Sequence, residues 1–515
     1  MKHLNTSKIS ITSFILCIIL SSLFLQDAKC ESKQISVTIL FLNDLHGYLT
    51  PTKQGETSVE IGGIARIAAL INNIRAENKH KNIKTFFLIA GDILQGTPLS
   101  TVYKGEPDIK ILNIIKTDAL TVGNHEFDFG LDNFLILKEN ADFPFISSNI
   151  IWKNTGKLVC QPFTVLPLNP DLSITVIGAT TQELLTTTNP LNVEKIDVID
   201  SIAEVKKNYE TQKLKGPVIL LSHSNFRTDA KIAENTQDLC AIIGGHDQIL
   251  FSPYRKIGRV PVFQAFEKGK YLGKIDLAVD PETKKAEITD WQYIQITDKI
   301  DIDKEVESLL CKYTDDLDKK FKEVIGEAKT FLDGERERIR YEETNLGDWI
   351  TDIMKEFTSA EAAFINSGSI RSSINKGPIT MEDVFKMMPY ANEIVITQLT
   401  GTEILKMLTR SVKGLREDED GGFLHVSGIS FKINDKSIEN VIIGGNPIDL
   451  QKIYRIAITD FLASGGDSYS FLKTKPCLST GLPLRELIID TVRKKHTIDA
   501  IKQDRIIRKK SLANK

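Results

Sequence analysis

Residues 37–47 read VTILFLNDLHG, and this stretch decides the fold class. Its first six residues are apolar or β-branched on both faces, which is typical of a strand buried on both sides in a layered α/β protein. Two residues able to bind metal, Asp44 and His46, follow at once. Working outward, helix-like polar stretches separate five more such runs, at 85–90, 119–122, 174–177, 218–221 and 241–243. The sequence therefore predicts an α/β domain over residues 31–300.

Metal-binding side chains follow these runs. The carboxyl ends of strands in layered α/β sheets form one rim, where ligands bind. Four of the eight histidines of the chain lie at such ends, a coincidence that separate structural roles do not explain. Oxygen and imidazole ligands suit a pair of divalent cations, which neutralise phosphoryl oxygens and activate water. The candidate ligands are Asp44, His46, Asp92, Asn124, His223, His246 and Gln248.

The pattern changes after residue 300. Residues 301–327 are strongly charged with apolar residues at helical spacing, which predicts an amphipathic helix linking two domains. A second, α+β pattern fills 328–515, and its polar residues are mostly Arg, Asn, aromatic and Asp rather than His. We expect helices near 346–357 and 401–413 and strands near 362–365, 423–432 and 453–459.

Residues 1–30 predict a secretory signal. Lys2 and Lys8 precede an apolar run over 11–25, which is shorter than the roughly 20 apolar residues of a spanning helix. We therefore expect a secreted or periplasmic protein without a membrane anchor in its mature chain, since the basic C-terminus also lacks the apolar tail of a lipid-anchor signal. The net charge of −3 gives no sign of binding to nucleic-acid polymers.

Four cysteines lie outside the signal segment. Their spacing matches no zinc pattern, and an oxidising compartment would allow up to two disulfides without requiring any. We interpret them as small buried residues: Cys160, Cys240, Cys311 and Cys477.

Five motifs resemble, in order and spacing, those of the calcineurin-like metallophosphoesterases: NDLHG (43–47), GDILQGTPLS (91–100), GNHEFDFG (123–130), SHSN (222–225) and GGHDQ (244–248). Within that group the chain looks like the secreted 5′-nucleotidases, which include bacterial UDP-sugar hydrolases and animal ecto-5′-nucleotidase. The resemblance extends over about residues 36–470. It implies a four-layer α/β/β/α sandwich followed by a C-terminal α+β substrate domain.

The resemblance also implies two divalent metal ions, of the Zn, Mn, Co or Mg class. Asp44, His46, Asp92 and Gln248 would hold one ion, and Asp92, Asn124, His223 and His246 the other. Asp92 would bridge the two, and Gln248 stands where many family members have a second His. His125 would face the phosphate, stabilising charge or protonating the leaving oxygen, while Asp128 fixes its tautomer.

In the second domain the resemblance implies a nucleotide site. Aromatic faces can sandwich a base, a carboxylate can bind ribose hydroxyls, and guanidinium groups can bind phosphate. The chain departs from the family pattern at Ser367 and Ser369, where glycines are usual, and at Tyr390, where Phe is common. The implied contacts are Arg340 and Arg371 on phosphate, Asn366 near the base, Tyr390 and Phe461 on its two faces, and Asp467 on ribose.

The sequence as a whole predicts a hydrolase of nucleoside 5′-monophosphates that acts on a small-molecule substrate in a cleft between the domains. Di- and triphosphates, UDP-sugars and dinucleotides are further expected substrates, because the same pocket would bind their nucleoside end. Family members close by domain rotation, which makes 300–327 a candidate hinge region. Three alternatives stay open: a 2′,3′-cyclic phosphodiesterase with 3′-nucleotidase activity, a thiosulfohydrolase, and a secreted nucleotide-binding protein without catalysis.

Overall fold

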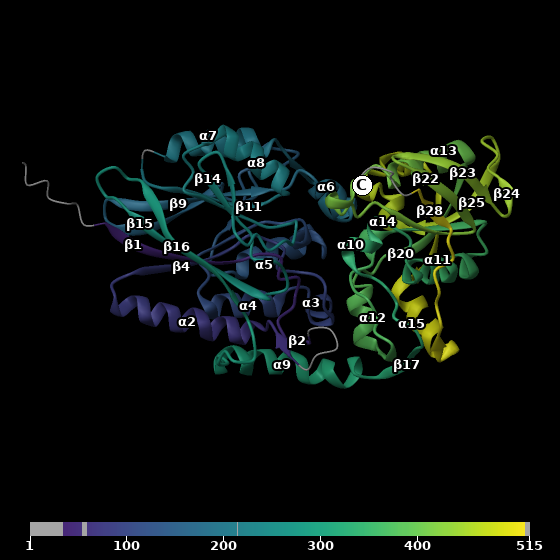
Figure 1. Ribbon diagram of the computed structural model, residues 1–515, viewed down its shortest axis with the longest axis horizontal. Coiled ribbons are helices and arrows are strands. Elements are labelled where there is room, and N and C mark those ends of the chain that lie inside the picture. Colours follow the sequence, from purple (N-terminus) through teal and green to yellow (C-terminus); the bar gives the residue numbers. More distant parts are fainter. Residues whose placement is uncertain (1–33, 54–58, 214, 510–515) are drawn as a thin grey trace, which may run out of the picture.

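The computed structural model of the 515-residue chain describes residues 34–53, 59–213 and 215–509. The expected signal segment, 1–30, lies outside the described residues. Two domains lie side by side along the long axis, the first running from β1 to β16 and the second from β17 to β28 (Figure 1).

Two six-stranded sheets form the centre of the first domain. One has the order β16-β15-β1-β4-β5-β6, and the other β13-β14-β12-β11-β9-β8. The outer strands are β6 (Phe145–Ile146), β15 (Tyr271–Val279) and β16 (Ala286–Gln295) in the first sheet, and β8 (Phe163–Asn169), β13 (Arg255–Ile257) and β14 (Val260–Phe263) in the second. The strands that precede the candidate ligands run parallel to one another within each sheet, β1 with β4 and β4 with β5 in one sheet and β11 with β12 in the other. These strands are β1 (Ile35–Leu42), β4 (Lys84–Ile89), β5 (Ala119–Thr121), β11 (Val218–His223) and β12 (Ala241–Gly244). Strand β9 (Leu172–Thr180) runs parallel to β11 but precedes none of the candidates.

Helices cover the outer face of each sheet. In β1, Ile39 and Phe41 pack between the two sheets, whereas Leu40 and Leu42 pack against the outer helices. This double burial explains why the run over 37–42 does not alternate with polar residues. The four-layer α/β/β/α architecture is therefore confirmed. The covering helices are α2 (Ile64–His80), α4 (Glu106–Ile115) and α5 (Leu131–Asn140) on one side, and α7 (Ser201–Gln212) and α8 (Phe226–Asn235) on the other.

The amphipathic segment expected over 301–327 contains α9 (Lys304–Phe321). Val306 and Leu310 on its apolar face are buried in the core of the first domain, where α9 packs against α2 and α4. Leu317 contacts the cores of both domains, and Phe321 is buried in the second. The helix therefore lies along both domains, as its course at the lower edge of Figure 1 shows.

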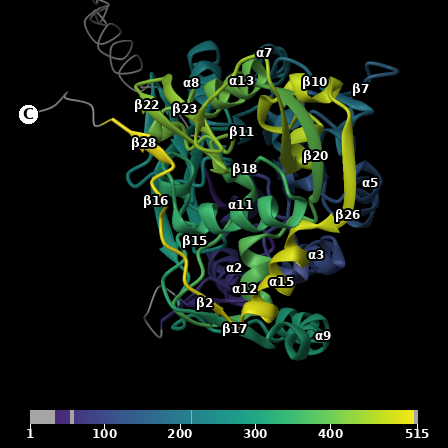
Figure 2. The same cartoon turned by 90° about the vertical axis from the view of Figure 1, so that its right-hand side faces the viewer.

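The second domain is built on the five-stranded sheet β21-β18-β25-β20-β26. Figure 2 looks onto this domain, where α11 (Asn345–Thr358) crosses the sheet and α15 (Leu484–Lys495) lies beside it. The opposite face packs on α13 (Gly401–Ser411) and on strands of the sheet β24-β23-β22-β28. The strands of this domain include β17 (Val324–Ala328), β18 (Ala362–Asn366), β20 (Glu393–Thr400), β21 (Leu424–Ser427), β22 (Ile429–Asn434), β23 (Ser437–Ile443), β24 (Asn446–Pro447), β25 (Ile453–Thr459) and β28 (Ile506–Arg508).

The four cysteines in the described residues are all free. Cys160 is buried and Cys240 partly buried, but Cys311 and Cys477 are exposed. Our interpretation of the cysteines as buried residues is therefore wrong for Cys311 and Cys477. Cys311 lies on the outer side of α9, and Cys477 is the first residue of β26 (Cys477–Pro483), which is an edge strand of its sheet. Within the described ranges, no helix combines the length and the apolar character needed to cross a bilayer.

Candidate active site

The candidate metal ligands lie at the carboxyl ends of strands in both sheets, with His223 as the last residue of β11 and the others on the loops after β1, β4, β5 and β12. The loops after β1 and β4 are tied together, since Asp44 N donates to Gly91 O and His46 N to Asp92 O, each at 3.0 Å. Backbone φ angles are positive at five of the candidates, a conformation that is uncommon outside glycine and that persists where the surroundings enforce it. These residues are Asp44, His46, Asp92, His246 and Gln248.

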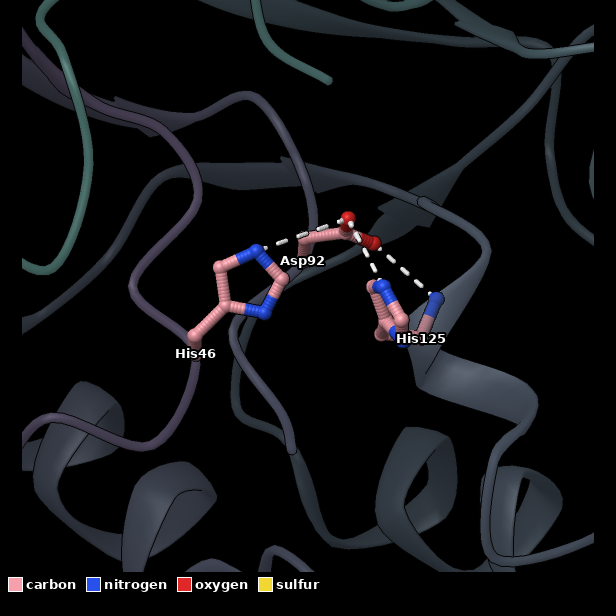
Figure 3. A group of neighbouring side chains, drawn as sticks. All are labelled: His46, Asp92 and His125. Atoms are coloured by element: carbon pink, nitrogen blue, oxygen red, sulfur yellow. Dashed lines mark hydrogen bonds and ion pairs between the residues drawn. The ribbon is translucent and has the colours of Figure 1, made fainter. Parts of the chain in front are cut away.

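Asp92 lies at the centre of this group. Its Oδ2 atom is 3.0 Å from Nε2 of His223 and 3.9 Å from Nε2 of both His46 and His125. Figure 3 shows the Asp92 carboxylate between the rings of His46 and His125. Two sets of donor atoms meet here, one from His46, Asp92 and His125 and one from Asp92, His223 and His246. A carboxylate common to both sets has the position that a bridging ligand needs.

His223 provides a test of whether a cation fits. Its Nδ1 atom lies 2.7 Å from Ala90 O, which fixes the donor on that side and leaves Nε2 facing Asp92 without a well-aligned hydrogen bond. Burial alone would lower the pKa of His223, but the carboxylates of Asp92 and Asp44 raise it to about 10. The position between these carboxylates therefore demands a positive charge, which a proton or a metal ion can supply.

The surroundings of Asn124 and His46 also fit a bound cation. The Oδ1 atom of Asn124 is buried without a hydrogen-bond partner, which is costly unless another donor or a cation occupies the space before it. Burial, with the neighbouring His125, holds the pKa of His46 well below its usual range, so the ring is neutral and able to bind a metal. Both residues fit divalent metal ions.

Gln248 is oriented differently from a ligand. Its Nε2 atom lies 2.7 Å from Nε2 of His46, while its Oε1 atom accepts a hydrogen bond of 2.8 Å from Arg336 of the second domain. A ligand role requires the amide to turn so that its oxygen faces the ion. Gln248 therefore contacts His46 of the metal group with one end of its amide and Arg336 of the second domain with the other.

Glu126 is a buried residue that our sequence analysis did not single out. One carboxylate oxygen accepts the backbone N–H groups of Asp92 and Gly123, at 3.0 and 2.6 Å, and the other accepts that of Ile93 at 2.9 Å. These bonds join the loop after β4 to the loop after β5. Gly123 leaves no room for a side chain, since a Cβ atom there would lie 2.2 Å from Asp92 Oδ1. Glu126 therefore determines the spacing of Asp92 and Asn124.

His125 and Asp128 form a close pair. The Nδ1 atom of His125 lies 2.5 Å from Oδ2 of Asp128, while the backbone N–H of His125 donates to Asp92 Oδ1 at 3.0 Å. Burial by itself would lower the pKa of His125, but the carboxylates of Asp128 and Asp92 outweigh it and raise the pKa. In this geometry a proton on Nδ1 of His125 would lie towards Asp128, which leaves Nε2 as the other ring nitrogen.

One cleft of about 1200 Å³ runs between the domains. Asp92, Asn124, His246 and Gln248 line it, whereas Asp44, His46 and His223 are buried. The ring of Tyr390 stacks at 6.3 Å from that of His125, with 25° between their planes. The structure thus brings the expected substrate residues to the same cleft as the metal group: Arg340, Asn366, Arg371, Tyr390, Phe461 and Asp467.

Asp467 is held by its neighbours in the second domain. Its carboxylate accepts a hydrogen bond of 2.7 Å from Asn366, whose own oxygen accepts one of 2.6 Å from Ser369. Burial and the nearby Asp420 raise the pKa of Asp467 to about 6. Arg410, which the sequence did not point to, donates to Asp467 O and to both carboxylate oxygens of Asp420. Asn366 therefore contacts the proposed ribose carboxylate directly.

Comparison with known proteins gives consistent matches for both domains. The calcineurin-like phosphoesterase family matches residues 37–250, and the 5′-nucleotidase C-terminal domain matches 324–474. A 5′-nucleotidase of Vibrio parahaemolyticus is 30% identical over 90% of each chain, and protein UshA of Escherichia coli is 29% identical over 91% of this chain and 93% of its own. The crystal structure of a 5′-nucleotidase precursor from Thermus thermophilus matches with a TM-score of 0.82 and 28% identity, covering 92% of this chain and 99% of its own.

Proposed function

Because the chain belongs to the 5′-nucleotidase family of metallophosphoesterases, which makes it a phosphoric monoester hydrolase, we propose that it hydrolyses nucleoside 5′-monophosphates to nucleoside and phosphate. UDP-sugars and nucleoside di- and triphosphates are proposed further substrates, since their nucleoside end is the same. The proposed location is outside the cytoplasm, in the periplasm or the medium, on the basis of residues 1–30.

A single observation carries the proposal: one cleft is lined both by the metal group and by groups suited to a nucleotide. His125 and His246 face it from the first domain, and Arg371, Phe461 and Asp467 from the second. Phosphate, ribose and base each find a complementary partner among these side chains. A phosphoesterase without nucleotide preference would need only the first group.

Metal ions would be held by the candidate ligands, of which His223, Asn124 and His46 fit a cation by their burial and hydrogen bonding. The proposed ligands of one ion are Asp44, His46, Asp92 and Gln248, and those of the other are Asp92, Asn124, His223 and His246. Two divalent cations would supply charge neutralisation of the phosphoryl oxygens and activation of the attacking water. Turning of the Gln248 amide away from Arg336 is part of this proposal.

The side chains of this chain have separate tasks in the reaction. Arg371, whose guanidinium group lies among the charges of Asp92, Glu267 and Asp128, would bind and orient the phosphate. His125, with its Nδ1 proton held by Asp128, would present Nε2 to the leaving 5′-oxygen of the ribose and protonate it as the P–O bond breaks. Phe461 and Tyr390 would hold the base and so determine which esters enter.

A substrate panel tests the proposal. Purified protein is assayed for phosphate release from AMP, UDP-glucose, ATP and 2′,3′-cyclic AMP, with and without a chelator. We expect chelator-sensitive release that is fastest with AMP. Preference for the cyclic nucleotide would instead favour the 2′,3′-cyclic phosphodiesterase alternative, and no release from any of the four substrates would refute the catalytic function.

A further inference from the structure

Residues 181–193, which make up most of the connection from β9 to β10 (Ile196–Val198), form a segment that we call the bridge loop. The loop contains α6 (Leu184–Thr187), which lies between the two domains in Figure 1. Leu184 anchors it in the first core, and Glu183 Oε2 lies 3.2 Å from Nε2 of His246. Across the cleft, α6 packs against η5 (Gly466–Ser468). These contacts hold the bridge loop in place independently of the His125–Asp128 pair.

From this fixed position the bridge loop contacts Asp128 twice. Thr188 Oγ1 donates to Asp128 Oδ1 at 2.6 Å, and Asn192 Nδ2 donates to the Asp128 carbonyl oxygen at 2.9 Å. Thr188 is only 1% exposed, so water does not compete for this bond. The two carboxylate oxygens of Asp128 therefore have one partner each, Thr188 on Oδ1 and His125 on Oδ2.

This division of partners has a directional consequence. A carboxylate can turn about its Cβ–Cγ bond and present either oxygen to an imidazole. A buried hydroxyl that binds one oxygen stops this turn and keeps the other directed at His125 Nδ1. The imidazole is then held with Nε2 towards Asp92, whose Oδ2 lies 3.9 Å away.

We propose that Thr188 is a positioning residue for the hydrolysis reaction, the third member of a Thr188–Asp128–His125 chain. The inference rests on the proposed function, because it assumes that His125 takes part in catalysis. Thr188 acts through Asp128 and contributes a hydroxyl rather than bulk. It therefore affects turnover and not the binding of substrate or metal.

The test compares Thr188→Val, which keeps the shape and removes the hydroxyl, with Thr188→Ser, which keeps the hydroxyl. Thr186→Val is the matched control, because Thr186 Oγ1 donates only to the Glu183 carbonyl oxygen of the same turn. Each variant is assayed for kcat and KM with AMP and with p-nitrophenyl phosphate, whose leaving group needs no proton, and for metal content and Tm. His125→Asn is made alone and together with Thr188→Val.

We expect Thr188→Val to lower kcat with AMP about 10-fold, part of what a general acid contributes, with KM within about twofold. The loss should be smaller with p-nitrophenyl phosphate and absent in the His125→Asn background, while Thr188→Ser and Thr186→Val resemble wild type.

Unchanged kcat in a folded, metal-loaded Thr188→Val protein would overturn the inference, as would losses that add to those of His125→Asn. If Thr188→Val fails to fold, the serine variant decides, since retained activity supports a hydroxyl role and lost activity contradicts it. Should His125→Asn itself retain full activity, the role of His125 in the proposed function fails, and the inference fails with it. That outcome is distinct, because it appears in the single His125 variant.

Discussion

Glu126→Gln should weaken metal binding, although Glu126 is not one of the proposed ligands. The carboxylate of Glu126 accepts three backbone N–H groups, from Asp92, Ile93 and Gly123, and so joins two ligand-bearing loops. Glutamine has the same shape but only one oxygen. Its NH2 group must therefore face at least one N–H donor, and that donor loses its partner.

The size of the effect follows from the bonds lost. A hydrogen bond to a charged group contributes about 1.5–3 kcal/mol, and a buried unpaired N–H costs a similar amount. Glu126→Gln removes one of the three hydrogen bonds and leaves the other two with an uncharged acceptor, and we take the resulting loss of free energy as about 3 kcal/mol. If this cost falls on the metal-bound arrangement, metal affinity drops about 100-fold, at about 1.4 kcal/mol for each factor of ten.

Competition with a chromophoric chelator measures the affinity directly. Burial and the nearby Asp92 raise the pKa of Glu126 to about 7, so the comparison is made at pH 8.5, where the wild-type side chain is ionised. Glu139→Gln, which removes the same charge from an exposed position on α5, serves as the control. Equal metal affinity in the Glu126→Gln and control proteins would show that Glu126 does not determine the spacing of the ligands.

Three further predictions concern the cleft and the second domain. Phe461→Ala should raise KM for AMP about 10-fold and leave hydrolysis of p-nitrophenyl phosphate unchanged, because base stacking contributes about 1–3 kcal/mol; equal effects on both esters would contradict this. His125→Asn should cut kcat by about 100-fold or more while metal content, measured by atomic absorption, stays near wild type. Burial and the neighbouring Glu343 raise the pKa of Asp348 to about 8, so the folded state keeps a proton that the unfolded state loses from about pH 4. Stability should therefore fall as the pH rises towards 8, and Asp348→Asn should flatten this dependence of Tm.

Burial patterns in the sequence accounted for most of the strands and for the gathering of the ligands. The run over 37–42 and the polar residues after it became β1 and the loop of Asp44 and His46, because chain direction alone places the carboxyl ends of parallel strands together. In the second domain, the helices and strands expected from the apolar periodicity lie close to those in the structure. The helix expected over 346–357 is Asn345–Thr358, and the strand expected over 453–459 is Ile453–Thr459.

The supporting residues could not be predicted in the same way. Glu126 binds backbone N–H groups, and every residue except proline has one, so the sequence does not show which of them need a partner. The position of Glu126 between Asn124 and Asp128 in the motif was the one signal that could have pointed to it. Thr188 lies 60 residues from its partner Asp128, and no local pattern connects them. The exposure of Cys311 depends on which face of α9 packs, because a small residue fits either side of an amphipathic helix.

The position of α9 has a practical consequence for dividing the protein into fragments. A fragment ended at residue 300, where the composition changes, would leave the first domain without Val306 and Leu310 and expose the core surface beneath them. A second-domain fragment begun at β17 would in turn lack Phe321. We therefore expect proteolysis or truncated expression to yield a stably folded first domain only when the cut follows Phe321. A stably folded second domain should require that the end of α9 is included. The same helix would have to be duplicated to make both halves.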